Sequence, residues 1–234
     1  MSANVIFAFE LPSWWGFAVF GAVFVGIFVL ATYLSRKRTQ ALTTLALQQG
    51  LTFEGDKWLT PESAPQLESP LFQGKSGPGF KNIISGKRGG LSCSFVDYSY
   101  RSGKNSISQT LATFTQDVWL PQFAVGPSDM LHKFSDALLH KAIQFESDPD
   151  FSKRFRLVSP DPDKAREMFA PGLLTFIENL DPAAKWHIEG SGRTLIIYRQ
   201  GKQVSAEAYP AFIDATTDMA KTFLSLSGLK KPSA

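Results

Sequence analysis

LPSWWGFAVFGAVFVGIFVLATYLS, residues 11–35, is a run of 25 residues without a charged side chain. An α-helix rises about 1.5 Å per residue, so about 20 apolar residues cross the bilayer's hydrocarbon core of about 30 Å. Trp14 and Trp15 lie near one end of the run and Tyr33 near the other, as aromatic residues do at membrane interfaces. The run therefore predicts one transmembrane helix surrounded by lipid.

Charged residues beside the run predict its orientation. Arg36, Lys37 and Arg38 follow it directly, whereas the first ten residues contain Glu10 and no Lys or Arg. A cleaved signal peptide has the opposite order, with a positive start and a shorter apolar core. Positively charged flanks stay in the cytoplasm, so we expect the inner (cytoplasmic) membrane, the N-terminus outside and the C-terminal domain in the cytoplasm.

The rest of the chain is close to neutral. Residues 39–229 hold 19 basic and 20 acidic side chains, so the excess positive charge comes from the two ends. A nucleic-acid-binding domain concentrates Lys and Arg on one face, and this balance argues against that class.

The single cysteine, Cys93, excludes an intrachain disulfide and zinc sites built on several cysteines. In an apolar strand it is expected to be buried.

The order of the expected elements predicts an α+β fold. Turn-forming residues separate short apolar runs with strand character, and helical periodicity appears mainly in the second half. Such segregated runs favour a mixed, mostly antiparallel sheet with packed helices over a parallel sheet. Strands are expected at residues 51–53, 80–85, 91–100, 106–115, 118–125 and 155–158, with a hairpin of 186–188 and 194–198 around Gly190-Ser191-Gly192. Helices are expected at 129–139, at 164–180 with a break at Pro171-Gly172, and at 211–226 with a buried stripe of Phe212, Ala215, Met219 and Phe223.

These elements give a domain organisation in four parts. Residues 1–35 form the N-terminal tail and transmembrane helix, and 36–50 form a juxtamembrane stalk helix that ends at Gly50. Residues 51–229 form the cytoplasmic α+β domain, as one unit or as two of about 51–145 and 146–229, and 230–234 form a basic tail. Four prolines between 55 and 79 predict an irregular loop there.

Two possible ligand-binding motifs are incomplete. Gly74-Lys75-Ser76 is similar to the end of a phosphate-binding loop, but position 69 is serine where that motif needs glycine, and Pro78 follows at once. His132, Asp136 and His140 recur every four residues, which leaves the two histidines about 12 Å apart along a helix, too far for one zinc ion. We predict no cofactor and no metal.

Four aspartates lie beside prolines, and such a set of carboxylates is a candidate for catalysis of hydrolysis or for Mg²⁺ binding. They are Asp148, Asp150, Asp161 and Asp163, in two Asp-Pro-Asp repeats. Aspartate in such a setting accepts hydrogen bonds from nearby backbone N–H groups and starts turns or helices. No Gly-x-Ser-x-Gly elbow occurs, and His187 has no evident nucleophile partner. We therefore predict helix capping and no catalytic residues.

One hairpin places polar side chains in mid-strand. If residues 102–105 form its turn, Asp97 lies opposite Thr110 and Tyr98 lies opposite Gln109. Polar groups at such positions need partners when they are buried. The four residues form either a satisfied cross-strand network or a polar groove for a peptide or a lipid headgroup.

The succession of short motifs resembles a family of bacterial membrane-anchored proteins described as domains of unknown function. The resemblance covers most of the chain and implies a membrane-tethered domain without an established activity, so it carries no functional residues. After the transmembrane helix and its basic stop, it rests on Leu45-Ala46, Gly50-Leu51, Phe53, Leu71-Phe72, Gly74, Asn82, Gly86, Asp97-Tyr98, Tyr100, Gln109-Thr110, Leu120-Pro121, Phe123, Phe151, Phe155, Asp163 and Ala165-Arg166.

These observations favour a non-enzymatic interaction or scaffolding module, an accessory subunit that binds another membrane protein. Two alternatives remain open. One is an enzyme that acts on lipid or peptide at the membrane surface, for which a deep pocket near Asp97 or His187 would be the sign. The other is a ligand sensor that signals through the stalk.

Overall fold

The computed structural model describes residues 15–55, 69–72, 76–128 and 142–229. The chain forms two compact units, Met1–Ala41 and Leu42–Ala234. Several predictions lie outside the described residues: those for Trp14, for Gly74-Lys75, for the helix 129–139 with its two histidines and Asp136, and for the basic tail.

The first unit consists of most of α1 (Trp15–Gln48). Among the described residues, α1 is the one helix long and apolar enough to cross a membrane, with a mean hydropathy of 2.4 in its most apolar window. Its large apolar side chains are exposed, namely Phe17, Val19, Phe20, Val23, Phe24, Val25, Ile27, Phe28, Val29, Leu30 and Leu34. A soluble protein rarely leaves so much contiguous apolar surface in contact with water.

The last turns of α1 belong to the second unit. Leu42, Leu45 and Ala46 are buried in its larger core. The helix ends at Gln48, and the predicted stop residue Gly50 follows it, with φ +66° and its N–H donating to Leu47 O at 3.1 Å. Leu51 N then bonds to Ala46 O at 2.8 Å, so the last carbonyl groups of the helix are satisfied.

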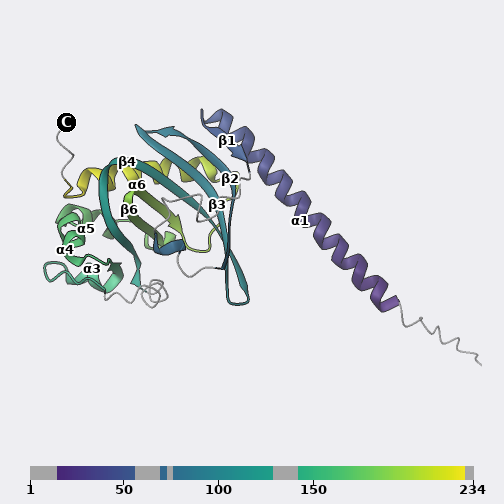
Figure 1. Ribbon diagram of the computed structural model, residues 1–234, viewed down its shortest axis with the longest axis horizontal. Helices are drawn as coiled ribbons and strands as arrows, with labels where there is room; N and C mark the ends of the chain where they lie inside the picture. The colour runs from purple at the N-terminus through teal and green to yellow at the C-terminus, as the bar shows by residue number, and fades with distance from the viewer. Residues whose placement is uncertain (1–14, 56–68, 73–75, 129–141, 230–234) are drawn as a thin grey trace, which may run out of the picture. The chain divides into compact units, whose positions relative to one another are not determined.

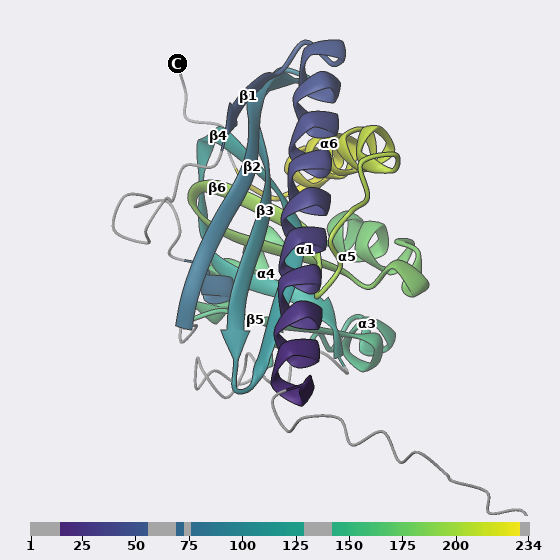
Figure 2. The ribbon, with the colours of Figure 1, turned by 90° about the vertical axis from the view of Figure 1, so that its right-hand side faces the viewer.

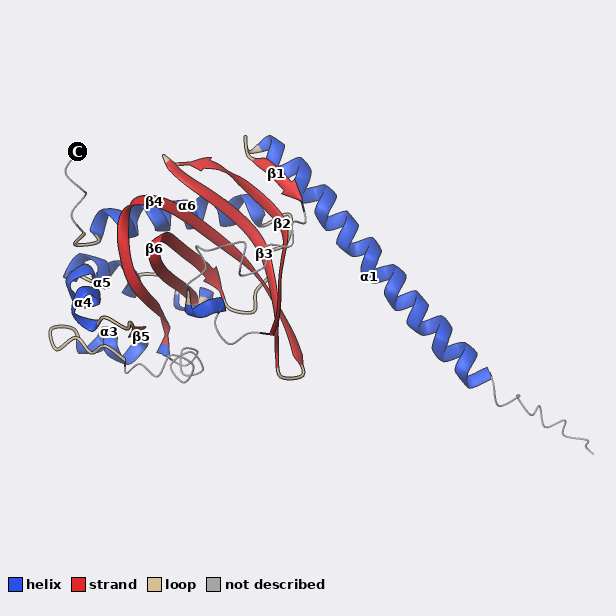
Figure 3. Cartoon of the chain, viewed as in Figure 1, coloured by secondary structure: helices blue, strands red, loops and turns tan. Residues whose placement is uncertain are grey.

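The second unit is built on a six-stranded antiparallel sheet (Figure 3). Its strand order is β1-β2-β3-β4-β5, and β6 also pairs with β4. The strands are β1 (Thr52–Gly55), β2 (Ser76–Arg88), β3 (Leu91–Ser102), β4 (Asn105–Pro127), β5 (Phe155–Val158) and β6 (Trp186–Arg199). The helices are α3 (Pro149–Arg154), α4 (Pro162–Met168), α5 (Pro171–Glu178) and α6 (Tyr209–Leu226), with short 3-10 turns at Pro70–Phe72 and Pro182–Ala184. The predicted α+β class is confirmed.

The two faces of the sheet carry different cores. The larger core joins one face to helices, with α6 running across the strands (Figures 1 and 2). Aromatic rings link the layers there: Phe123 of β4 stacks on Phe223 of α6 at 5.6 Å and meets Phe169 at 5.3 Å. The smaller core, on the other face, is rich in tyrosine and includes Tyr98 and Tyr198.

β4 is one long strand, although the sequence predicted two. Its first half pairs with β3 up to Thr115, and its end pairs with β5 from Ala124. Pairing with β6 is interrupted between Thr115 and Leu120. In β4, even-numbered residues up to Phe114 face the larger core. From Phe123 onward, odd-numbered residues face it instead. An irregular stretch in mid-strand explains this change, and it is also where Pro121 is tolerated.

The predicted hairpin around Gly190-Ser191-Gly192 is wrong, because these residues lie inside the single strand β6. The two glycines serve different purposes, and neither forms a turn: Gly190 makes room for an aromatic ring of β4, and Gly192 adopts a positive φ. A Cβ atom on Gly190 would lie 2.8 Å from Cζ of Phe123, and Trp119 covers Gly192, whose φ is +57°. Glycine inside a strand often marks such a close approach.

Smaller differences concern element ends and one helix face. β2 begins at Ser76, inside the predicted loop, with a register shift between Ser76 and Gly79 that spans Pro78. In α6 the predicted residue Ala215 is exposed, and Thr216 is buried in its place with its hydroxyl donating to Phe212 O at 2.7 Å. The predicted bounds of β5 are confirmed.

Candidate interaction surface

The predicted register of the β3–β4 hairpin is confirmed, with Asp97 opposite Thr110 and Tyr98 opposite Gln109. The two pairs lie on opposite faces, because neighbours along a strand alternate. Asp97 accepts hydrogen bonds from Asn82 Nδ2 at 2.8 Å and Thr110 Oγ1 at 3.1 Å. Thr110 Oγ1 accepts in turn from Val204 N at 2.9 Å, so these contacts tie the loop after β6 to the sheet.

Gln109 also holds that loop, since its Oε1 accepts from Gly201 N at 2.9 Å. Neither of the clefts described below is lined by Asp97, Tyr98, Gln109 or Thr110, nor by His187. His187 is buried, with Nδ1 3.1 Å from Lys185 O and its ring stacked on Tyr198. A polar groove at the four hairpin residues stays a prediction.

The structure also contains a buried carboxylate that the sequence did not predict. Glu189 of β6 is 1% exposed and accepts hydrogen bonds from Tyr198 OH at 2.5 Å, from Leu71 N at 3.0 Å and from the Ser69 hydroxyl. Burial, and then the Glu189 charge, hold the pKa of Tyr198 well above its ordinary value. The cluster attaches the 3-10 turn at Pro70–Phe72 to the smaller core.

The predicted aspartate caps are confirmed at two positions. Asp148 accepts from Phe151 N at 3.0 Å at the start of α3, and Asp161 accepts from Lys164 N at 3.2 Å at the start of α4. Asp150 and Asp163 form ion pairs within the same helices. The described residues contain no group of three or more His, Cys, Asp or Glu placed to hold a metal ion.

The predicted membrane-interface residues that the structure describes lie on α1. Tyr33 is exposed, as are Arg36 and Lys37, whereas Arg38 is half-buried. Trp15 is the first described residue of the helix. The single apolar helix, followed by this basic cluster, indicates a membrane anchor.

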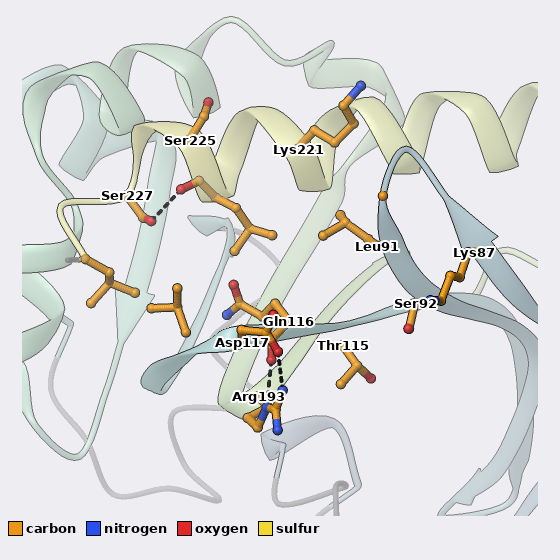
Figure 4. Close-up of a pocket in the computed structure, with 14 residues that line it drawn as sticks. Lys87, Leu91, Ser92, Thr115, Gln116, Asp117, Arg193, Lys221, Ser225 and Ser227 are labelled. Atoms are coloured by element: carbon orange, nitrogen blue, oxygen red, sulfur yellow. Dashed lines mark hydrogen bonds and ion pairs between the residues drawn. The ribbon is translucent and has the colours of Figure 1, made fainter. Parts of the chain in front are cut away.

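The second unit contains a cleft of about 1040 Å³, which we call the α6 cleft. It lies between the second half of α6, the β2–β3 turn and the irregular stretch of β4 (Figure 4). Its walls carry Leu91, Val118, Leu224 and Leu229. Two lysines, Lys87 of β2 and Lys221 of α6, are exposed among its lining residues, and neither has an ion-pair partner among the described residues.

The β4 side of the α6 cleft carries a buried amide. Gln116 is 7% exposed, and its Nε2 atom has no hydrogen-bond partner within the described part of the chain. Its side chain extends into the space between β4 and α6 (Figure 4). Arg193 stands beside it, with Nε donating to Gln116 O at 2.8 Å and its guanidinium paired with Asp117. A buried donor without a partner is costly, so an acceptor on a bound molecule would lower the free energy of this group.

A second hollow of about 630 Å³, the Trp119 groove, adjoins the first, and Leu229 lines both. Trp119 is 73% exposed and is the most exposed large apolar residue among those described in residues 69–229. Asp161, Lys164 and Glu167 of the α4 region also line this groove. Tryptophan is, with tyrosine and arginine, enriched among the residues that contribute most of the binding energy at protein interfaces.

No family model matches this sequence, and no curated protein matches it. Among solved structures, the crystal structure of the mycobacterial trehalose monomycolate transport factor A, TtfA, is similar to this chain, with a TM-score of 0.54 and 12% sequence identity. The match covers 85% of this chain and 99% of that one. At this identity the likeness shows a shared fold.

Proposed function

We propose that this protein is a membrane-anchored, non-enzymatic interaction module, an accessory subunit of a larger membrane-protein complex. The proposal rests on one observation: the two units expose different kinds of surface. α1 exposes an unbroken apolar surface suited to lipid, and the second unit exposes Trp119 in a groove that adjoins the α6 cleft. An anchored domain with an exposed aromatic residue beside clefts is suited to bind a partner in the same membrane.

Two further observations support the proposal. The protein with the similar fold is a transport factor by its name, and an accessory role in membrane transport is consistent with a tethered binding domain. The sequence resemblance also points to bacterial membrane-anchored proteins, and we place this chain with them. The basic cluster after α1 supports an N-terminus outside and the second unit in the cytoplasm, at the inner membrane.

Membrane attachment is tested by extracting membranes with alkaline carbonate. We expect the full chain to stay with the membrane and to be released by mild detergent. A variant with arginine in place of Phe24 and Phe28, two exposed residues of α1, should become extractable. Arginine at Leu47 and Ala41, near the helix end, is the matched control. Release of the wild-type chain by carbonate would overturn the anchor.

The accessory role is tested by purification in mild detergent after chemical cross-linking in the membrane. A discrete membrane protein should accompany the wild-type chain in constant proportion and be lost from the Trp119→Ala variant. A wild-type chain that always emerges alone would contradict the proposal. Orientation is tested separately with Lys104→Cys in a Cys93→Ser background, which should react with an impermeant maleimide only after the inner membrane is opened.

A further inference from the structure

The side chains that line the α6 cleft indicate the chemistry of the partner that it can bind. It combines apolar walls, two exposed lysines and one buried amide donor. Its charged lining residues are Lys87, Lys221, Arg193 and Asp117, and the last two neutralise each other in an ion pair. The cleft therefore presents a net positive rim around an apolar interior, although residues 39–229 as a whole carry a net charge of −1.

The rim lysines come from different elements and are positioned by the fold. Lys87 lies near the end of β2, and Lys221 projects from α6, where its aliphatic stem passes over Gly89 in the β2–β3 turn. Figure 4 shows both lysines on the side of the cleft nearest that turn. Both lysines are exposed and lack an ion-pair partner among the described residues, so their flexible side chains are available to acidic groups of a molecule bound at the rim.

Size and backbone geometry favour an extended chain over a small molecule. The α6 cleft alone has the volume of a large ligand site, and it continues at Leu229 into the Trp119 groove. Residues 116–119 of β4, between Thr115 and Leu120, pair with no residue of β3, β5 or β6 in the described part of the sheet. An extended peptide can add to such an unpaired stretch with its backbone and place alternate side chains in pockets.

We infer that the α6 cleft binds an extended acidic peptide segment of the partner, with apolar side chains between Leu91 and Leu224 and acidic side chains at Lys87 and Lys221. Gln116 Nε2 donates to a carbonyl or carboxylate oxygen of that segment. This inference rests on the proposed function, because it names the chemistry by which the accessory module recognises its partner. Trp119 packs against the part of the same segment that continues into the neighbouring groove.

Fluorescence anisotropy with the full chain in mild detergent tests the inference. The probes are labelled synthetic peptides in which glutamates alternate with leucine or phenylalanine, and matched peptides with lysine in place of each glutamate. The acidic peptides should bind, and the basic ones should not. Lys87→Glu combined with Lys221→Glu should weaken binding about tenfold or more. Lys104→Glu combined with Lys202→Glu, an equal charge change at exposed sites outside both clefts, should leave binding unchanged.

The Gln116→Leu variant distinguishes an effect on peptide binding from an effect on the stability of the fold. Replacing a buried amide that lacks a partner by an apolar side chain should leave the urea midpoint unchanged or raise it. The same variant should weaken the acidic peptides about fivefold, because it removes the donor. A lower midpoint with unchanged peptide affinity would show that Gln116 has only a structural role and would overturn its part in the site.

Two other outcomes would overturn the inference. Equal affinity for acidic and basic peptides would remove the charge argument. Capture of phosphatidylglycerol vesicles, lost in the Lys87 and Lys221 variant and unaccompanied by peptide binding, would assign the cleft to anionic lipid instead. Either outcome leaves the proposed function standing if the cross-linked partner still co-purifies, so the two failures are distinguishable.

Discussion

Tyr198 OH donates a 2.5 Å hydrogen bond to Oε1 of Glu189 in the smaller core of the sheet. The other carboxylate oxygen, Oε2, accepts from the Ser69 hydroxyl and from Leu71 N. One buried acid of β6 thus holds a segment more than a hundred positions earlier in the sequence. Hydrogen bonds to a charged group in such surroundings are stronger than neutral ones, and losing a partner there is costly.

A pair of tyrosine variants tests this contact. Tyr198→Phe should lower the free energy of unfolding by about 1–3 kcal/mol, because Glu189 loses a donor. Tyr98→Phe should change it by less than about 0.5 kcal/mol, since the Tyr98 hydroxyl is buried without a hydrogen-bond partner among the described residues. Urea denaturation measures both. Equal losses would show that the hydroxyl–carboxylate bond is not the source of the effect.

Alkaline pH should destabilise the second unit. Burial raises the pKa of Tyr98, Tyr100 and Tyr198. The native state therefore keeps protons that the unfolded chain releases near pH 10, so the contribution to stability is complete below about pH 10 and is lost as pH rises further. Urea midpoints measured from pH 8 to 11 should fall above about pH 10. In Tyr98→Phe the urea midpoint should fall less steeply with pH. The same slope as in the wild type would contradict the role of the Tyr98 pKa.

Gly190 should not tolerate a side chain. An alanine Cβ there would press on the Phe123 ring, so Gly190→Ala should destabilise the protein by about 1–3 kcal/mol. Gly172→Ala is the matched control, because its new Cβ would meet only Leu226 Cδ2, at an ordinary 3.6 Å. The control should be neutral or slightly stabilising. A tolerated Gly190→Ala would mean that the glycine serves a purpose other than close packing.

Cys93 should react slowly in the folded protein. It is buried, and burial raises the pKa of its thiol despite the opposing charge of Arg88, so little reactive thiolate forms near neutral pH. Iodoacetamide labelling followed by mass spectrometry should be slow in buffer and fast in urea. A cysteine placed at Lys104 in a Cys93→Ser background should label at once. Equal native rates at the two sites would contradict the burial of Cys93.

The sequence was sufficient for the features set by local rules. The apolar length of residues 11–35, the glycine stop at Gly50 and the capping aspartates predicted elements that the structure contains. The β3–β4 register followed from the turn alone, because antiparallel pairing is fixed once the turn is known. Each of these signals depends on residues close together in the sequence.

The features that escaped prediction depend on distant contacts. Gly190 and Gly192 have the composition of a turn, but the Phe123 ring of another strand explains Gly190, and a positive φ inside β6 explains Gly192. Glu189 looks like an exposed strand residue until Tyr198 and the turn near Leu71 enclose it. The exposure of Trp119 likewise follows from the irregular β4, for which Pro121 was the available signal.

Site-specific photo-cross-linking in intact membranes tests most directly the claim that this anchored module binds a membrane protein through its second unit. A photoreactive phenylalanine analogue would replace Trp119 in one variant and Lys104, at the exposed β3–β4 turn, in another. We expect one discrete cross-linked membrane protein from position 119 and none from position 104. Cross-links at neither position, or the same products from both, would contradict the account.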